Sequence, residues 1–215
     1  MGVNAELNAL QKEVTRQRIL EAGFHAFAEK GIDRVAMTDV AEAAGIGIAT
    51  VYRYFSTKSA LAMAISAWTW EQYLTPALQA AESRKVTAAV EFGYYLEVFL
   101  DLYRNHKEML RFNQFFNIFV ENGGIPPDAL GPFADVVKRV TAQFHAIYRT
   151  GQEDGTLRTD VPEREIFSAT LHLMLAAVTR YAVGLVYDSG LDPEKELVLL
   201  KQMLLREFTL NIKSE

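Results

Sequence analysis

Apolar residues recur at intervals of three and four along nearly the whole chain, and this spacing restricts the fold more than any other feature. It is the period of one face of an α-helix. A half-buried strand needs alternate apolar positions, and no run of that kind is long enough here. The sequence therefore predicts an all-α protein of roughly nine helices. The expected helices cover residues 12–29, 37–44, 48–55, 58–80, 86–104, 107–121, 129–151, 163–187 and 193–212.

Composition limits the class of protein. The 215 residues are half apolar, which is enough for a sizeable core in one or two domains. There is no cysteine, so a disulfide scaffold, a thiolate zinc site and a cysteine nucleophile are excluded. The N-terminus lacks the basic start and apolar run of a signal peptide. The longest apolar stretch, Ile166 to Tyr187, contains His172 and Arg180 and is expected to be a buried helix. We expect a cytoplasmic protein.

The charge is unevenly distributed, although only mildly. The formal net charge is −5, and residues 1–60 hold seven basic and seven acidic side chains, so the remainder carries the excess. Any contact with nucleic acid is therefore expected in the first part of the chain. It would come from the placement of individual side chains rather than from bulk charge.

The stretch "GIGIATVYRYFSTKSAL", from Gly45 to Leu61, contains two close glycines. A dinucleotide-binding loop needs a third glycine, where this chain has Thr50, and a preceding strand, where this chain predicts a helix. A tight turn between two short helices explains the glycines better. Gly45 permits the turn, and Gly47 opens the second short helix with backbone amides free to meet an anion.

The second short helix has two distinct faces. Val51 and Phe55 are four residues apart, and we expect them to pack with Val40, Ala41 and Ala44 against the preceding helix. The opposite side offers small, hydroxyl-bearing and basic side chains, which suit a DNA groove and its phosphates. These side chains are Ala49, Thr50 and Arg53, flanked by Tyr52 and Lys58.

The segment from Ile19 to Leu61 resembles the DNA-binding domain of the TetR family of bacterial transcriptional regulators. The resemblance covers about a fifth of the chain. It rests on Ile19, Leu20, Ala22, Phe27, Gly31, Asp39, Ala41, Ala44, Gly45, Thr50, Val51, Tyr52, Tyr54, Phe55, Lys58 and Leu61. The chain differs from the family in having Gly47 where serine is common, and Val35 and Ala36 where a Thr or Ser cap is common.

The resemblance implies a helix-turn-helix domain over residues 1–57 and a helical effector-binding and dimerisation domain over 58–215. It implies a dimeric transcriptional regulator, with a repressor as the favoured kind. The dimer would bind a palindromic operator in duplex DNA, and an effector would release it from the DNA. It assigns Tyr52 and Lys58 to phosphates and Ala49, Thr50 and Arg53 to the groove. The Tyr54 side chain is expected to lie partly in the core and partly at a phosphate. Thr38 is a further candidate for a phosphate contact.

Aromatic residues recur along the helices predicted after residue 58, and two interpretations stay open. They are either plain core packing or the lining of a mostly apolar effector pocket, which the resemblance favours. The candidates for the lining are Trp68, Tyr95, Phe112, Phe115, Phe116, Phe119, Phe144 and Tyr148, with His172 as a polar anchor.

The last two predicted helices carry more apolar surface than one small domain needs, including Leu185, Leu204 and Phe208. This favours a two-fold four-helix interface between two copies of the chain. The four histidines lack metal-site spacing, and no nucleophile motif occurs, so we expect no catalytic site, metal or cofactor. A small helical enzyme, or an interaction protein that does not bind DNA, is the alternative.

Overall fold

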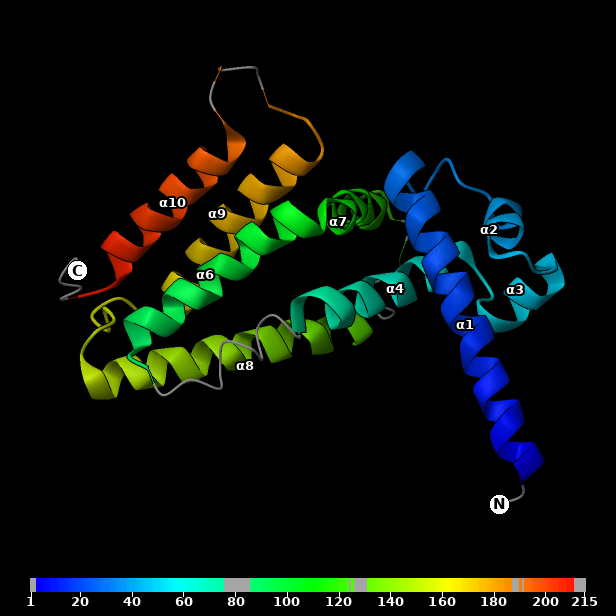
Figure 1. Cartoon of the computed structure of the whole chain (residues 1–215), viewed down its shortest axis with the longest axis horizontal. Coiled ribbons are helices and arrows are strands. Elements are labelled where there is room, and N and C mark those ends of the chain that lie inside the picture. The colour runs from blue at the N-terminus through cyan, green and yellow to red at the C-terminus, as the bar shows by residue number, and fades with distance from the viewer. Residues whose placement is uncertain are drawn as a thin grey trace. The chain divides into compact units, whose positions relative to one another are not determined.

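The computed structural model describes residues 3–75, 86–123, 125, 131–186, 190 and 192–210. Within these ranges the chain forms nine α-helices, one π-helical turn and no strand apart from an isolated bridge between Leu157 and Thr209 (Figure 1). The all-α prediction is therefore confirmed. The elements are α1 (Val3–Lys30), α2 (Met37–Ala44), α3 (Ile48–Tyr54), α4 (Lys58–Thr69), η1 (Trp70–Leu74), α6 (Ala88–Asn105), α7 (Lys107–Glu121), α8 (Gly131–Asp154), α9 (Glu163–Ala182) and α10 (Pro193–Phe208).

Three of the predicted helices differ most from the structure at their ends. The first helix begins at Val3 rather than 12, and its added turns expose Leu7 and Leu10. The fourth gives way to the π-helical turn η1 after Thr69, and residues 76–80 of its predicted extent lie outside the described residues. The helix predicted over 163–187, α9, stops at Ala182, because Gly184 has a positive φ of 74° and closes the helix.

The chain divides into two compact units. The first contains Met1–Thr69 and Arg111–Ala134, and the second contains Trp70–Leu110 and Asp135–Glu215. In the first unit α1 packs against α2 and α4, and α2 packs against α3. The residues that the sequence predicted to pack inward, Val40, Ala41, Ala44, Val51 and Phe55, are all buried. They pack with buried Leu20, Phe24 and Phe27 of α1.

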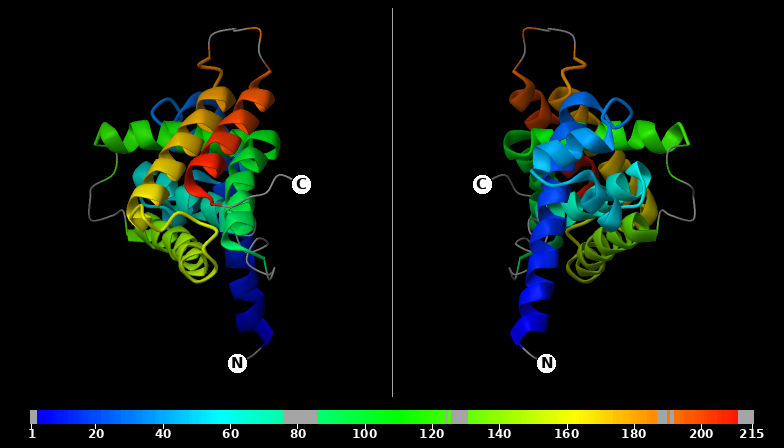
Figure 2. Two further views of the ribbon diagram at one scale, coloured as in Figure 1. Left: turned by 90° about the vertical axis from the view of Figure 1, so that its left-hand side faces the viewer. Right: turned by 90° about the vertical axis from the view of Figure 1, so that its right-hand side faces the viewer.

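In the second unit α6, α9 and α10 pack against one another, and Figure 2 (left) looks onto α9 and α10. Aromatic rings from α6 and α8 meet in its core, where Phe144 lies 6.1 Å from Phe92 and 5.5 Å from Tyr95, measured between ring centroids. Among the helices that the structure describes, none is long and apolar enough to cross a membrane.

Candidate nucleic-acid interface

The turn between α2 and α3 has the geometry that the two glycines predicted. Gly45 has φ +64°, the left-handed conformation that ends many helices, and the amide of Ile46 donates to the carbonyl of Ala41 at 3.0 Å. Gly47 is then the N-cap of α3 and offers no side chain to its amides. The first turn of α3 therefore has backbone donors available to an anion.

The outer face of α3 is polar and accessible. Val51 is fully buried and fixes the helix against the core. Ala49, Tyr52 and Arg53 are exposed, while Thr50 and Tyr54 are half-buried. The guanidinium carbon of Arg53 lies 5.7 Å from the centre of the Tyr54 ring, so the ring supports the charged group along the helix. This face can donate hydrogen bonds to base edges and phosphates.

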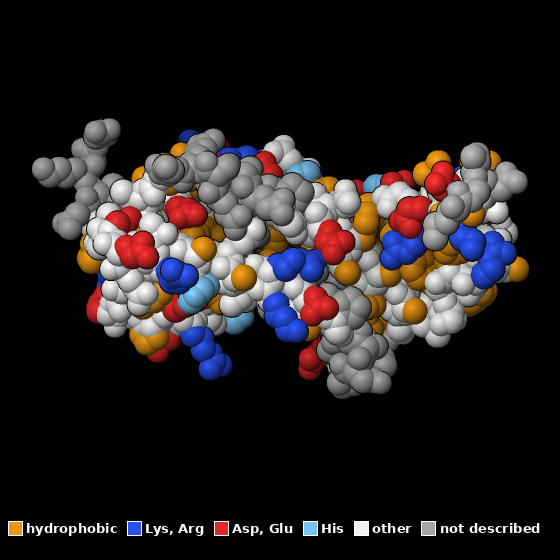
Figure 3. Space-filling view, turned by 90° about the horizontal axis from the view of Figure 1, so that it is seen from below, with side chains coloured by type: hydrophobic (Ala, Val, Ile, Leu, Met, Phe, Trp, Pro, Cys, Tyr) orange, Lys and Arg blue, Asp and Glu red, His pale blue; other side chains and the backbone are white. Residues whose placement is uncertain are grey.

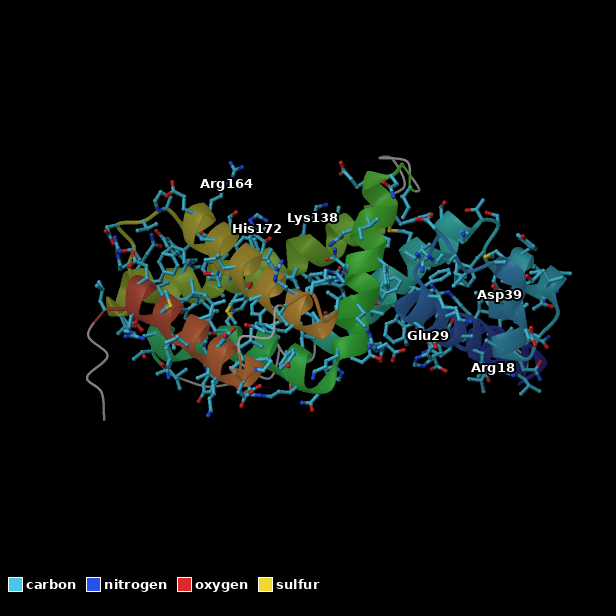
Figure 4. The ribbon with its side chains drawn as sticks, turned by 90° about the horizontal axis from the view of Figure 1, so that it is seen from above. Arg18, Glu29, Asp39, Lys138, Arg164 and His172 are labelled. Carbon is cyan, nitrogen blue, oxygen red and sulfur yellow. The ribbon has the colours of Figure 1, made fainter. Side chains whose placement is uncertain are left out.

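Two side chains to which the sequence analysis assigned no contact hold α2 in place. Arg18 of α1 donates from Nη2 to the carbonyl of Ala44 at 2.8 Å and so satisfies the end of α2. Asp39 accepts a hydrogen bond from the amide of Ala36 at 2.8 Å, which caps the start of α2 in place of the usual Ser or Thr. Both side chains are labelled in Figure 4. Thr38 is exposed in the first turn of α2.

Lys58 differs in environment from the other predicted contact residues. Its Nζ donates to the carbonyl oxygens of Ile32 at 2.9 Å, Asp33 at 3.1 Å and Val35 at 3.1 Å. An ammonium group has three donors, and these bonds use all of them. The phosphate contact predicted for Lys58 stays untested, and in this structure its charge is directed into the turn between α1 and α2.

The face of the molecule shown in Figure 3 carries charges of both signs, with basic and acidic side chains among apolar ones. Because the formal net charge of the chain is −5, binding to DNA would depend on locally placed donors such as those of α3.

The aromatic residues predicted to line a pocket fall into both units. In the first unit the Phe112 ring lies 5.8 Å from the Phe24 ring and 5.9 Å from the Phe116 ring, and Trp68 meets Phe24 edge-on. Phe112, Phe116 and Phe119 are buried. This arrangement fits core packing, one of the two interpretations left open by the sequence. Half-buried Phe115 instead lines a surface hollow of about 600 Å³, together with Glu29–Arg34 and Ile118.

In the second unit Tyr95 is 1% exposed and is surrounded by Phe92, Phe99 and Phe144. Its hydroxyl group has no hydrogen-bond partner among the described residues. Burial raises the pKa of Tyr95, so the phenol stays neutral. A buried hydroxyl left without a partner is uncommon in native cores, and it marks a place where a bound molecule or water would supply one.

Tyr148 and His172 are placed differently. The Tyr148 hydroxyl donates to the carbonyls of Val161 at 3.0 Å and Thr159 at 3.2 Å, and therefore ties α8 to the loop before α9. His172 is exposed on α9 and lies 3.3 Å from the hydroxyl of Ser168. In Figure 4 both His172 and Arg164 are directed away from the helices of the second unit.

The apolar residues of α9 and α10 fall into a buried set and an exposed set. Val178, Leu197 and Leu204 are buried in the core of their own unit. Leu173 of α9 and Leu199 and Met203 of α10 are instead 49%, 51% and 55% exposed. The spacing of apolar residues in the sequence does not separate these two sets, because both recur with the period of a helix. Leu204, expected at an interface, is a core residue in this structure.

Comparison with known proteins supports the helix-turn-helix assignment. Residues 19–65 match the family described as bacterial regulatory proteins, tetR family. The uncharacterized HTH-type transcriptional regulator YvdT of Bacillus subtilis (strain 168) is 31% identical over 98 residues, 44% of this chain and 48% of YvdT. An HTH-type transcriptional regulator of Staphylococcus aureus (strain USA300) is 44% identical over 46 residues, 21% of this chain and 25% of that protein. The chain thus spans half or less of the length of these relatives.

The fold resembles solved structures over most of its length. The transcriptional regulator FadR from Bacillus subtilis, in complex with stearoyl-CoA, superimposes with a TM-score of 0.70 at 17% identity. The match covers 89% of this chain and 96% of that chain. At this level of identity the likeness establishes the fold alone.

Proposed function

We propose that the chain is a TetR-family transcriptional regulator, a repressor that binds a palindromic operator. The observation that carries this proposal is the outer face of α3. It presents Ala49, Tyr52 and Arg53 to solvent from a short helix whose inner side is fixed by buried Val51. Small, aromatic and basic groups together can approach base edges and phosphates closely.

DNA-binding helices of this kind read two half-sites when the protein is a dimer. The exposed Leu173, Leu199 and Met203 of α9 and α10 supply an apolar surface that a second copy of the chain can cover. We propose that this face forms the two-fold interface. The regulator would act in the cytoplasm, where its operator is found.

We propose a small, mostly apolar effector that binds in the second unit beside Tyr95. The support is the unpartnered hydroxyl of Tyr95 within a group of aromatic rings. FadR from Bacillus subtilis has a similar fold, and its structure is a complex with stearoyl-CoA, a molecule with a long apolar chain. A ligand with a carbonyl or hydroxyl group could bury its apolar part among the rings and bond Tyr95.

The experiment that tests DNA binding starts from duplexes enriched from a random library by the wild-type protein. Arg53→Ala should weaken binding to the enriched duplex by about 1–3 kcal/mol and broaden the accepted bases, because Arg53 would lose contacts with base edges. Arg164→Ala, which removes an exposed arginine of the second unit, is the charge-matched control and should bind like the wild type. Failure of the wild-type protein to enrich any sequence would overturn the proposal.

The effector is tested separately with stearoyl-CoA as the first probe, followed by a panel of shorter acyl-CoA thioesters and aromatic acids. A compound that occupies the site should raise the melting temperature of the protein and release the enriched duplex, since it must favour one state of the protein over the other. If no compound of the panel does either, this effector class is rejected while the DNA-binding proposal still stands.

A further inference from the structure

The carbonyl oxygens of the turn between α1 and α2, residues 31–36, are held by the side chain of Lys58 at the start of α4. Lys58 Nζ lies within 3.1 Å of three carbonyl oxygens of the turn, those of Ile32, Asp33 and Val35. Charged donors form stronger hydrogen bonds than neutral ones. We name this group, Lys58 with the three carbonyls, the Lys58 clamp.

The turn holds itself only weakly. Its internal backbone bonds run from the amide of Arg34 to Gly31 at 3.3 Å and from that of Val35 to Ile32 at 3.4 Å, both longer than a typical N–H···O bond. Residues 29–34 also line the surface hollow, where Phe115 and Ile118 are the neighbours from α7. The clamp bonds are shorter than the internal ones, so they are the stronger constraint on the carbonyls.

The start of α4 is itself well defined. The hydroxyl of Thr57 accepts a hydrogen bond from the amide of Ala60 at 3.0 Å and caps the helix, which places Lys58 in its first turn. The clamp therefore connects a fixed helix start to the segment that leads directly into α2. A displacement of the first turn of α4 would be passed to α2 through these bonds.

We infer that Lys58 is a positioning residue, which fixes the α1–α2 turn, and with it α2 and α3, to the start of α4, rather than a phosphate contact. The inference rests on the proposed DNA binding for its effect on affinity, but the clamp itself can be observed without DNA. It assigns to Lys58 a role opposite to the one expected from the sequence. Loss of the clamp should weaken binding to every duplex by misplacing α3.

The geometry distinguishes lysine from arginine here. Three carbonyls that converge on one atom suit a compact ammonium with three donors, whereas a planar guanidinium spreads its donors over a fork. At a phosphate, arginine is at least as good a partner as lysine. Lys58→Arg therefore separates the two roles, and Lys58→Met removes the charge while keeping an unbranched side chain.

The test measures binding to the enriched duplex as a function of salt concentration for wild type, Lys58→Arg and Lys58→Met. Lys30→Met, an exposed lysine at the end of α1, is the control for loss of one charge. Both Lys58 variants should bind at least about tenfold more weakly, since hydrogen bonds of a charged donor are lost. The salt dependence of Lys58→Met should match that of Lys30→Met, and that of Lys58→Arg, which keeps the charge, should match that of the wild type. Wild-type affinity in Lys58→Arg, with a slope lower by about 0.9 in Lys58→Met alone, would overturn the inference.

A measurement on the wild-type protein covers the case in which the variants fail to fold. The ammonium signal of Lys58 in nitrogen-15 NMR, assigned by its absence from Lys58→Arg or by selective labelling, should be visible without DNA and unmoved when the duplex is added. A signal that appears or shifts only with DNA contradicts the clamp. If the wild-type protein binds no duplex, the proposed function fails, and the DNA-free spectrum still decides whether the clamp exists.

Discussion

At the scale of single residues, the buried hydroxyl of Tyr95 leads to a specific prediction about stability and effector binding. Its hydroxyl is buried among Phe92, Phe99 and Phe144 without a described partner. An unsatisfied hydroxyl in a core costs free energy that a phenylalanine would not incur. Retaining it is explained if a bound effector supplies the missing hydrogen bond.

Tyr95→Phe should therefore stabilise the ligand-free protein, by up to about 1 kcal/mol, and reduce its response to an effector. Tyr148→Phe is the matched control, because its hydroxyl does have partners in the carbonyls of Thr159 and Val161 and its removal should destabilise by about 1 kcal/mol. Denaturant unfolding followed by circular dichroism measures both. Equal destabilisation by the two substitutions would show that Tyr95 is not an orphaned group.

At the scale of elements, the turn between α2 and α3 depends on one glycine. Gly45→Ala should destabilise the first unit by about 1–2 kcal/mol, because φ +64° is unfavourable for a residue with a Cβ. The new Cβ would also lie 3.3 Å from Nη2 of Arg18. Gly47→Ala meets nothing within 4 Å at φ −69° and should leave stability nearly unchanged. Thermal unfolding compares the two, and the expectation fails if both behave alike.

The stability that the packing of α6 against α10 gives to the fold is expected to depend on pH through Glu97. Burial alone would raise the pKa of Glu97, but hydrogen bonds from Lys201 and Arg104 outweigh it, and the pKa lies below its ordinary value of 4.5. Folding is therefore favoured by ionised Glu97 above the unfolded pKa, and this stability is lost as the pH falls through the lower folded pKa.

The melting temperature should accordingly fall as the pH is lowered below about 4.5. Glu97→Gln removes one contribution to that fall, so its profile should be flatter on the acid side than that of the wild type. Glu153→Gln, an exposed carboxylate at the end of α8, is the control and should keep the wild-type slope. If the melting temperature falls with pH in the same way in all three proteins, Glu97 does not contribute to the loss of stability in acid.

At the scale of the whole molecule, the expected assembly is a dimer through α9 and α10. Leu173→Glu combined with Met203→Glu places charge on the exposed apolar face and should produce folded monomers that bind the enriched duplex weakly, since one copy reads one half-site. Val90→Glu, at an equally accessible apolar position on α6, should stay dimeric. Sedimentation at micromolar concentration checks both, and a monomeric wild-type protein would contradict the assembly.

The same surface shows why an interface is hard to choose from sequence. A test based on Leu204 would have confused dimerisation with folding, because Leu204 is 5% exposed and its replacement by glutamate would disrupt the core. Leu199 with Met203, and Leu197 with Leu204, are two sets of apolar residues on α10, each at helical spacing. Their different roles follow only from which side of α10 meets α6 and α9.

The sequence by itself determined the helical class and the helix-turn-helix motif. The three-to-four spacing of apolar residues is a local property, and it specified α2 at its observed bounds and placed Val51 and Phe55 inward. Gly45 was predicted as a turn residue because only a residue without Cβ adopts that conformation readily.

Only the tertiary structure decided what the long side chains do. Lys58 meets carbonyls more than twenty residues away in the chain, and His172 is exposed on α9. The change from α4 to the π-helical turn η1 after Thr69 was likewise not predicted from the sequence. A flexible lysine or an exposed apolar stripe fits several environments equally well in sequence, and the energy that selects one comes from partners that folding brings together.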